Sequence, residues 1–206
     1  MQSLRKLQEE GKIRHIGVSN FAAPKLKEVL STGTVIAVNE LPYSLLARAI
    51  EYEILPLCKQ IGIGVVGYMP LWQGLLTDRF ANLDELPVLR RRTRHFDAGK
   101  NHLARHGEPG AEEETWQVVV EVREIARELG LKTAEVALRW ALANQGISCV
   151  LAGARTRQQL EANVAAAAEA LPEEVVQRLG RVTEALKAKL GPGFDYFEST
   201  ANDRTR

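Results

Sequence analysis

The residues best suited to chemistry in this chain lie in its last third, directly after a short apolar run. Gly153 lets a ligand approach the backbone closely, and the N–H groups that open the following helix point back toward it. Arg155 adds a forked positive charge that matches phosphate oxygens. Gln159 and Asn163 are four residues apart, so they share one helix face and can reach one ligand. The pattern predicts a phosphate site, but an ordinary strand–turn–helix with Thr156 as N-cap has the same residues.

A second polar pair, Ser19-Asn20, ends an apolar segment near the N-terminus. Polar side chains at the carboxyl end of a parallel strand face a ligand more often than a core. The Asn20 amide offers both a donor and an acceptor, which suits another amide as its partner. An Asx turn in which Asn20 caps the next helix would use the same residue, and this alternative stays open.

Residues 67–110 contain the remaining candidate groups. Tyr68 ends an apolar run, where its ring can either stack on a flat ligand or fill the core. His102 and His106 are four residues apart, but no carboxylate or cysteine has suitable spacing, so we expect no metal site. The arginines at 90–94 either grip an anion or lie on a solvated loop.

The chain alternates strand and helix patterns that would position these residues. Four short apolar runs are typical of buried strands, at residues 15–18, 35–38, 64–68 and 148–152. Between them we expect helices with Pro24 in a first turn, Thr133 as an N-cap and Pro172 opening one long last helix. The alternation predicts an α/β fold with a parallel sheet and right-handed crossovers. Four such strands fit either an open doubly wound sheet or half of an eight-stranded barrel.

Composition narrows the class of protein. The chain has 206 residues, 45% hydrophobic and 26% charged, with a formal net charge of +1, which is typical of a folded globular protein. The charge gives no reason to expect nucleic acid or a membrane surface as partner, and no apolar run approaches the roughly 20 residues of a membrane span. Because Cys58 and Cys149 lie in apolar contexts, we expect two buried free thiols in a reducing cytoplasm.

Four segments together resemble the aldo-keto reductases, which are NAD(P)H-dependent oxidoreductases on a (β/α)8 TIM barrel. Residues 11–21, GKIRHIGVSNF, are similar to the motif that opens the family's fifth strand. The segments similar to the motifs of its sixth, seventh and eighth strands are residues 38–46, 67–76 and 153–163. The four segments follow the family's order at the ends of all four expected strands. The resemblance therefore implies one partial domain over residues 1–206, the C-terminal half of a barrel.

The resemblance also implies a cofactor, NADP(H), and the residues that hold its nicotinamide end. Ser19 and Asn20 match the pair that binds the carboxamide. Glu40 stands where the family usually has Gln, so it can accept a hydrogen bond from the amide but cannot donate one. Tyr68 matches the aromatic residue that stacks on the nicotinamide ring.

The rest of the implied cofactor site follows the last two strands. The residues expected beside the pyrophosphate are Leu71, Gln73 and Gly74. Those expected at the 2′-phosphate and the adenine are Gly153, Ala154, Arg155, Gln159 and Asn163. By the same resemblance, residues 77–110 form a long loop over the cofactor, and residues 191–206 form a tail that lines the substrate pocket. The apolar candidates for the pocket walls are Trp72, Phe80, Phe194 and Phe197.

The family's catalytic Asp, Tyr, Lys and His come from its first four strands, which have no counterpart in this sequence. We therefore assign no catalytic residue and expect the chain alone to be inactive. Four strands would leave two free sheet edges, so we expect self-association or pairing with a chain that carries the first half.

Three functions remain in competition. The first is NADPH-dependent reduction of a small-molecule carbonyl, to which this chain contributes the cofactor half. The second is a non-catalytic module that binds NADPH as a regulatory ligand. The third is an unrelated flavodoxin-like domain, but the segment Ser19-Asn20-Phe21 lacks the glycines of a phosphate loop after its first strand.

Overall fold

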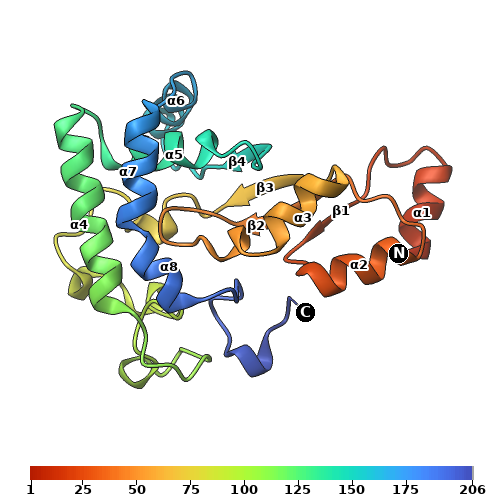
Figure 1. The fold of residues 1–206 in the computed structure, drawn as a ribbon, viewed down its shortest axis with the longest axis horizontal. Coiled ribbons are helices and arrows are strands. Elements are labelled where there is room, and N and C mark those ends of the chain that lie inside the picture. Colours follow the sequence, from red (N-terminus) through yellow and green to blue (C-terminus); the bar gives the residue numbers. More distant parts are fainter. Residues whose placement is uncertain (206) are drawn as a thin grey trace.

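Four short strands form one parallel sheet, in the order in which they occur along the chain (Figure 1). In this computed structural model, which describes residues 1–205, the strands are β1 (Gly17–Ser19), β2 (Val38–Pro42), β3 (Gly64–Tyr68) and β4 (Cys149–Leu151). All three strand pairs are parallel, so the carboxyl ends of the strands share one edge of the sheet. The parallel α/β architecture predicted from the sequence is therefore confirmed.

Eight α-helices in residues 1–205 accompany the sheet. They are α1 (Gln2–Glu9), α2 (Ala23–Ser31), α3 (Ile54–Ile61), α4 (Glu112–Glu128), α5 (Thr133–Ala143), α6 (Arg157–Ala167), α7 (Glu173–Val182) and α8 (Glu184–Leu190). Pro24 lies in the first turn of α2, as predicted. Two local predictions are wrong. Thr133 does not cap α5, because its hydroxyl donates to Asp78 instead, and the single last helix is divided at Thr183 into α7 and α8.

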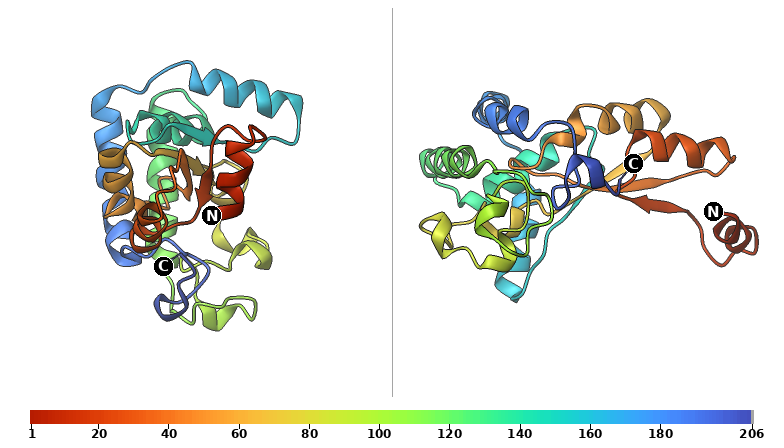
Figure 2. Two further views of the ribbon diagram at one scale, coloured as in Figure 1. Left: turned by 90° about the vertical axis from the view of Figure 1, so that its right-hand side faces the viewer. Right: turned by 90° about the horizontal axis from the view of Figure 1, so that it is seen from below.

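Side chains alternate between the two faces of the sheet. Val18, Leu41 and Val65 are buried in the hydrophobic core, whereas their neighbours Ser19, Glu40 and Val66 are more exposed. In the view from below in Figure 2, α2 and α3 lie on the same side of the strands. Within residues 1–205, the outer strands β1 and β4 each have a paired neighbour on one side only.

The second strand lies further along the chain than predicted. Its apolar run was expected at residues 35–38, but Val35 is 75% exposed and the strand runs from Val38 to Pro42. Asn39 can lie buried in it because its amide donates to the Phe21 carbonyl at 2.8 Å. Pairing with β1 and β3, rather than apolarity alone, therefore sets these bounds.

The two cysteines differ in burial. Cys58 is buried in α3, as expected, but Cys149 is exposed, and that expectation is wrong. Cys149 lies on an outer strand, where an apolar sequence context does not ensure a covering layer.

The long loop of residues 77–110 is held against the core by a buried histidine. The His95 ring lies 4.6 Å from the Trp72 ring and 5.2 Å from the Tyr196 ring, centroid to centroid. Its Nε2 is 2.7 Å from the Leu46 carbonyl oxygen, and its Nδ1 is 3.2 Å from the Thr93 hydroxyl. A neutral ring protonated at Nε2 satisfies both contacts. Burial lowers the pKa of His95 to about 3.

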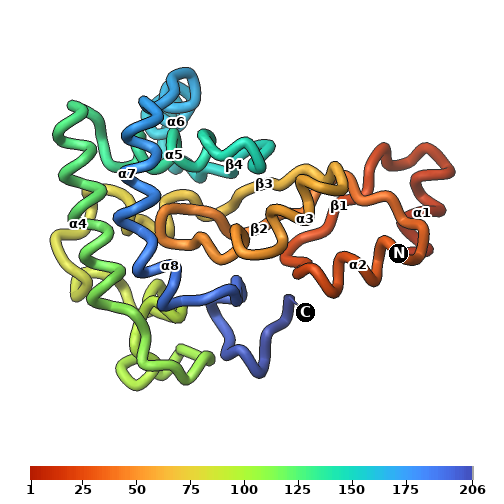
Figure 3. Tube along the Cα trace, viewed as in Figure 1, coloured from red at the N-terminus to blue at the C-terminus, as the bar shows by residue number. Residues whose placement is uncertain are grey.

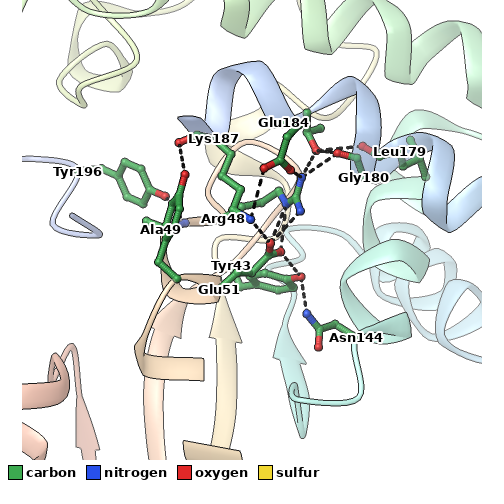
Figure 4. A network of polar contacts seen from close by, with 12 residues as sticks. Tyr43, Arg48, Ala49, Glu51, Asn144, Leu179, Gly180, Glu184, Lys187 and Tyr196 are labelled. Carbon is green, nitrogen blue, oxygen red and sulfur yellow. Dashed lines mark hydrogen bonds and ion pairs between the residues drawn. The ribbon is translucent and has the colours of Figure 1, made fainter. Parts of the chain in front are cut away.

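A second buried centre joins the connection after β2 to the last two helices (Figure 4). The Glu51 carboxylate accepts hydrogen bonds from the Tyr43 hydroxyl at 2.9 Å and from Arg48 at 2.8 Å, and it pairs with Lys187 of α8 at 3.0 Å. Arg48 also donates to the Gly180 carbonyl at 2.8 Å and to the Thr183 hydroxyl at 2.7 Å. These contacts fix α7 and α8, and through them the start of the C-terminal tail.

We predict that Glu51→Gln lowers the free energy of unfolding by about 3 kcal/mol, because it removes the buried carboxylate that Arg48 and Lys187 share and leaves them the more exposed Glu184. The measurement is urea unfolding followed by circular dichroism. Glu161→Gln is the control: it removes an exposed ion pair with Arg157 and is expected to cost less than about 0.5 kcal/mol. Equal losses in the two variants would contradict a buried network.

We also predict that His95 makes stability depend on pH. Between pH 6.5, the ordinary pKa of a histidine, and pH 3, this histidine is protonated in the unfolded chain but stays neutral in the folded protein. The free energy of unfolding therefore decreases as the pH is lowered through this range, by up to about 1.4 kcal/mol per pH unit from this group. Urea midpoints measured at several pH values should show a shallower slope for His95→Gln. The exposed His102 provides the control, and His102→Gln should keep the slope of the unaltered protein.

Candidate functional site

The carboxyl edge of the sheet brings four of the predicted site residues into one cluster. The Tyr68 hydroxyl donates to Asn20 Oδ1 at 2.8 Å, and Asn20 Nδ2 lies 3.0 Å from Ser19 Oγ. Ser19 Oγ in turn lies 3.3 Å from the main-chain oxygen of Glu40. The register explains the cluster, because Ser19 is opposite Glu40 in β1 and β2, and Tyr68 ends the next strand.

Asn20 takes part in this cluster instead of capping a helix. The N-cap of α2 is Ala22, which makes no side-chain cap, so the Asx alternative is wrong. Asn20 has a φ of +58°, in the left-handed region that asparagine tolerates better than most residues. This conformation turns its side chain toward Ser19 and Tyr68.

Tyr68 lies outside the hydrophobic core, so the alternative of a core aromatic is also wrong. Its ring is half-buried on the face that carries Ser19 and Glu40. Burial, with Asp195 and Glu40 nearby, raises the pKa of Tyr68 to about 12. The hydroxyl is therefore protonated at neutral pH and acts as a donor to Asn20.

A strained turn follows Tyr68. Three residues other than glycine have positive φ in it, Met69 at +57°, Trp72 at +39° and Gln73 at +57°, and Gly74 follows at +94°. Within the described chain, Trp72 Nε1 and Gln73 Nε2 are buried donors without a hydrogen-bond partner. Two unpaired donors in a strained turn are an arrangement typical of a binding site.

Arg90 of the long loop holds this turn, a role that neither alternative for the arginines at 90–94 included. Its Nη1 donates to the Gln73 carbonyl at 2.7 Å, and its guanidinium lies 5.9 Å from the Phe80 ring centroid. A Cβ at Gly74 would lie 3.3 Å from the same Nη1, so the turn fits closely against Arg90. The arginine run was visible in the sequence, but which of its members reaches the turn depends on how the loop folds.

The turn after β4 forms a third part of the site. Thr156 accepts a hydrogen bond from the Gln159 N–H at 3.2 Å, so it is the N-cap of α6. Gln159 Oε1 accepts from the Arg155 N–H at 2.8 Å, and Asn163 Nδ2 donates to the Gly153 carbonyl at 3.3 Å. Both side chains thus reach the same turn, as their spacing predicts. Ala154 is exposed between them.

This third turn is open to solvent. No atom lies within 4 Å of a Cβ placed on Gly153, and within residues 1–205 no hydrogen bond or ion pair engages the Arg155 guanidinium. Because Tyr68 is opposite Leu151 in the sheet, this turn leaves the same edge as the cluster of Ser19, Asn20, Glu40 and Tyr68. Three parts of the predicted site therefore lie at one edge of the sheet. They are the cluster around Tyr68, the turn from Leu71 to Gly74 after β3, and the turn at Gly153 after β4.

The C-terminal tail returns to this edge, as the trace in Figure 3 shows. The Thr205 carbonyl accepts a hydrogen bond from the Ala22 N–H at 2.8 Å, just beyond Asn20. Arg204 forms two hydrogen bonds with the Asp195 carboxylate, at 2.7 and 2.8 Å. Between the tail and the first turns of α2 and α3 lies a cleft of about 200 Å³.

Of the four apolar residues expected in pocket walls, one lines this cleft, namely Phe194. Trp72 and Phe80 are buried in the core instead, and Phe197 is half-buried with Arg92 over its ring at 5.8 Å. The expectation for Trp72 and Phe80 is wrong because His95 of the long loop packs against Trp72, and Phe80 is buried within that loop with Arg90 over its ring.

Residues 1–205 contain neither a cluster of metal ligands nor a helix suited to spanning a membrane. No three His, Cys, Asp or Glu side chains are grouped as a metal ion would require. None of the helices combines the length and apolarity needed to cross a membrane.

Comparison with known proteins matches residues 1–184 to the model of the aldo/keto reductase family. The chain is 32% identical over 184 residues to the NADH-specific methylglyoxal reductase of Escherichia coli (strain K12), covering 89% of this chain and 53% of that protein. It is 29% identical over 196 residues to the uncharacterized oxidoreductase YrpG of Bacillus subtilis (strain 168), covering 93% and 53%. The chain thus spans about half the length of these curated relatives.

Among solved structures, the chain is similar to the glycerol dehydrogenase AKR11B4 from Gluconobacter oxydans. The TM-score is 0.71 at 24% identity, over 88% of this chain and 52% of that one. It is also similar to the thermostable aldo-keto reductase Tm1743 in complex with the inhibitor epalrestat, with a TM-score of 0.64 at 22% identity over 88% and 53%. At these identities the two structures establish the shared fold.

Proposed function

The chain belongs to the aldo/keto reductase family, and we propose that it supplies the cofactor-binding side of an enzyme that reduces a small-molecule carbonyl with a nicotinamide cofactor. The observation that carries the proposal is the hydrogen-bonded cluster of Ser19, Asn20 and Tyr68 at the carboxyl edge of the sheet. An amide and an aromatic ring fixed side by side suit a nicotinamide, which has a carboxamide on a flat ring.

The described residues fit the remainder of such a cofactor. The unpaired donor of Gln73 suits an oxygen of a pyrophosphate, and Arg90 keeps its turn in place. The open turn at Gly153, with the unpaired Arg155 beside it, suits the adenosine end. When bound, the cofactor would supply the hydride, while these side chains bind and orient it.

Tyr68 would act as the platform for the nicotinamide ring. Because its hydroxyl donates to Asn20 and its raised pKa of about 12 keeps the proton in place, the ring cannot swing freely. A fixed platform exposes one face of a stacked ligand and covers the other, which determines the face that reacts.

The proton that a carbonyl needs would come from residues that a complete barrel adds to these four strands. Every tyrosine of the chain already has a hydrogen-bond partner: Tyr43 bonds Glu51, Tyr68 bonds Asn20, and Tyr52 and Tyr196 bond main-chain groups. We therefore assign no catalytic residue within this chain. The free edges of β1 and β4 are where the added strands would pair.

The two irregular segments would enclose the substrate. Residues 77–110 place Arg90 on the pyrophosphate turn, and the tail places Arg204 and Asp195 near Tyr68. The two free thiols, Cys58 and Cys149, suit a reducing cytoplasm.

We predict that the purified chain binds NADPH saturably but does not oxidise it in the presence of carbonyl compounds. Binding would be followed by the change in Trp fluorescence, since Trp72 adjoins the pyrophosphate turn. Tyr68→Ala should raise the Kd by about tenfold or more, because it removes a stacked ring. Clear turnover by the chain alone would contradict the assignment of the proton donor, and absence of binding would refute the cofactor site.

We predict a preference for NADPH over NADH that depends on Arg155. A forked guanidinium that binds a phosphate contributes about 1.5 to 3 kcal/mol to the binding free energy. Arg155→Ala should therefore lower the affinity for NADPH by about tenfold or more and leave the affinity for NADH unchanged. Arg157→Ala is the matched control, because its exposed side chain pairs with Glu161 on the next helical turn. Equal weakening of both cofactors by Arg155→Ala would refute a 2′-phosphate role. That result would bring the chain closer to its relative named as NADH-specific.

A further inference from the structure

Glu40 is a carboxylate within the cluster of Ser19, Asn20 and Tyr68 that we propose as the nicotinamide site. It lies in β2 directly opposite Ser19 of β1, and its main-chain oxygen accepts the Asn20 N–H at 2.9 Å. Its neighbours in the strand, Asn39 and Leu41, are buried on the helix side, so the half-buried Glu40 side chain belongs to the face that carries Ser19 and Tyr68.

The Glu40 carboxylate has no protein partner within residues 1–205. None of the ion pairs and side-chain hydrogen bonds of the described residues reaches it, although it is partly withdrawn from water. A half-buried charge without a partner is unfavourable, and it becomes favourable when a cation or a hydrogen-bond donor binds beside it.

Three charged groups act on the Tyr68 hydroxyl. Asp195 and Glu40 both raise the pKa of Tyr68, Asp195 more than Glu40, and Arg204 lowers it by less than either raises it. Asp195 and Arg204 form a two-fold hydrogen-bonded ion pair with each other. The ring platform therefore lies in a net negative field, and Glu40 is the carboxylate in it that has no cation as its partner.

We propose that Glu40 makes this site bind the oxidised form of the nicotinamide cofactor more tightly than the reduced form. The inference rests on the cofactor site proposed above. The oxidised nicotinamide ring carries a positive charge that the reduced ring lacks, while both rings carry the same carboxamide. A carboxylate beside the ring therefore attracts the oxidised form specifically, and its hydrogen bond to the amide NH2 serves both forms alike.

This preference bears on which direction of the reaction the site favours. Tighter binding of the oxidised form stabilises the state that follows carbonyl reduction and slows its release. The same charge equips the site to take up oxidised cofactor and work on an alcohol. A glutamine at this position would keep the amide contact and remove the bias, so Glu40 acts as a specificity residue for the redox state of the ligand.

The test is the ratio of two dissociation constants, measured by isothermal titration calorimetry of the full chain with NADP⁺ and with NADPH. Glu40→Gln keeps the size and the acceptor oxygen of the side chain but removes its charge. We expect it to weaken NADP⁺ binding by about tenfold relative to NADPH binding, which is somewhat more than the roughly fivefold effect of two unit charges 4 Å apart in bulk water. Glu40→Asp keeps the charge and should retain most of the bias.

The control is Glu28→Gln, which removes an exposed carboxylate of α2 and should leave the ratio unchanged. A fold defect would weaken the binding of NADP⁺ and NADPH together. The ratio of their dissociation constants therefore separates a charge effect from a structural one. The inference is overturned if Glu40→Gln weakens both forms equally or leaves the ratio as it was. If the unaltered chain binds neither form, the proposed cofactor site itself fails and the inference falls with it.

Discussion

Parallel pairing of four strands is the constraint on which the rest of this structure depends. The backbone hydrogen bonds place Ser19 of β1 opposite Glu40 of β2, and Tyr68 of β3 opposite Leu151 of β4. Since parallel strands all end at one edge, three loops far apart in the sequence meet there. A shift of one residue in β2 would turn Glu40 toward the helices and separate it from Ser19. The cluster of Ser19, Asn20, Glu40 and Tyr68 is therefore a consequence of strand register.

A sheet of such short strands needs support from its connections. Glu51 provides one such support, because it joins Tyr43 and Arg48 after β2 to Lys187 of α8. His95 provides another, because it packs the long loop against Trp72. Both centres are buried polar groups with complete partners, and such groups select one arrangement of loops because any other would leave them unpaired.

The same connections position the site. The long loop brings Arg90 to the strained turn, and α8 leads into the tail that places Asp195 and Arg204 near Tyr68. Packing of Trp72 between the rings of His95 and Tyr196 holds the turn in its unusual backbone conformation. The packing of the long loop and of the tail is thus joined to the turn through one residue, and a change in either the loop or the tail would reach the turn.

The sequence by itself determined the class of fold and the segments of the site. Alternating strand and helix patterns, with Pro24 and the glycine-ended helices as boundaries, were sufficient for a parallel α/β sheet. The convergence of Ser19, Asn20 and Tyr68 followed from that sheet, because parallel strands end together. These features are local in the chain, or need only the rule that joins local elements.

Only the tertiary structure decided which residues complete these segments. It moved the second strand to Val38–Pro42, exposed Cys149 on an outer strand, chose Arg90 from a run of arginines and gave Glu51 its buried partners. Each of these outcomes depends on a contact between distant parts of the chain. Periodicity and composition indicate which face of an element is apolar, but not which other element lies against that face. These four outcomes therefore could not be predicted from the sequence.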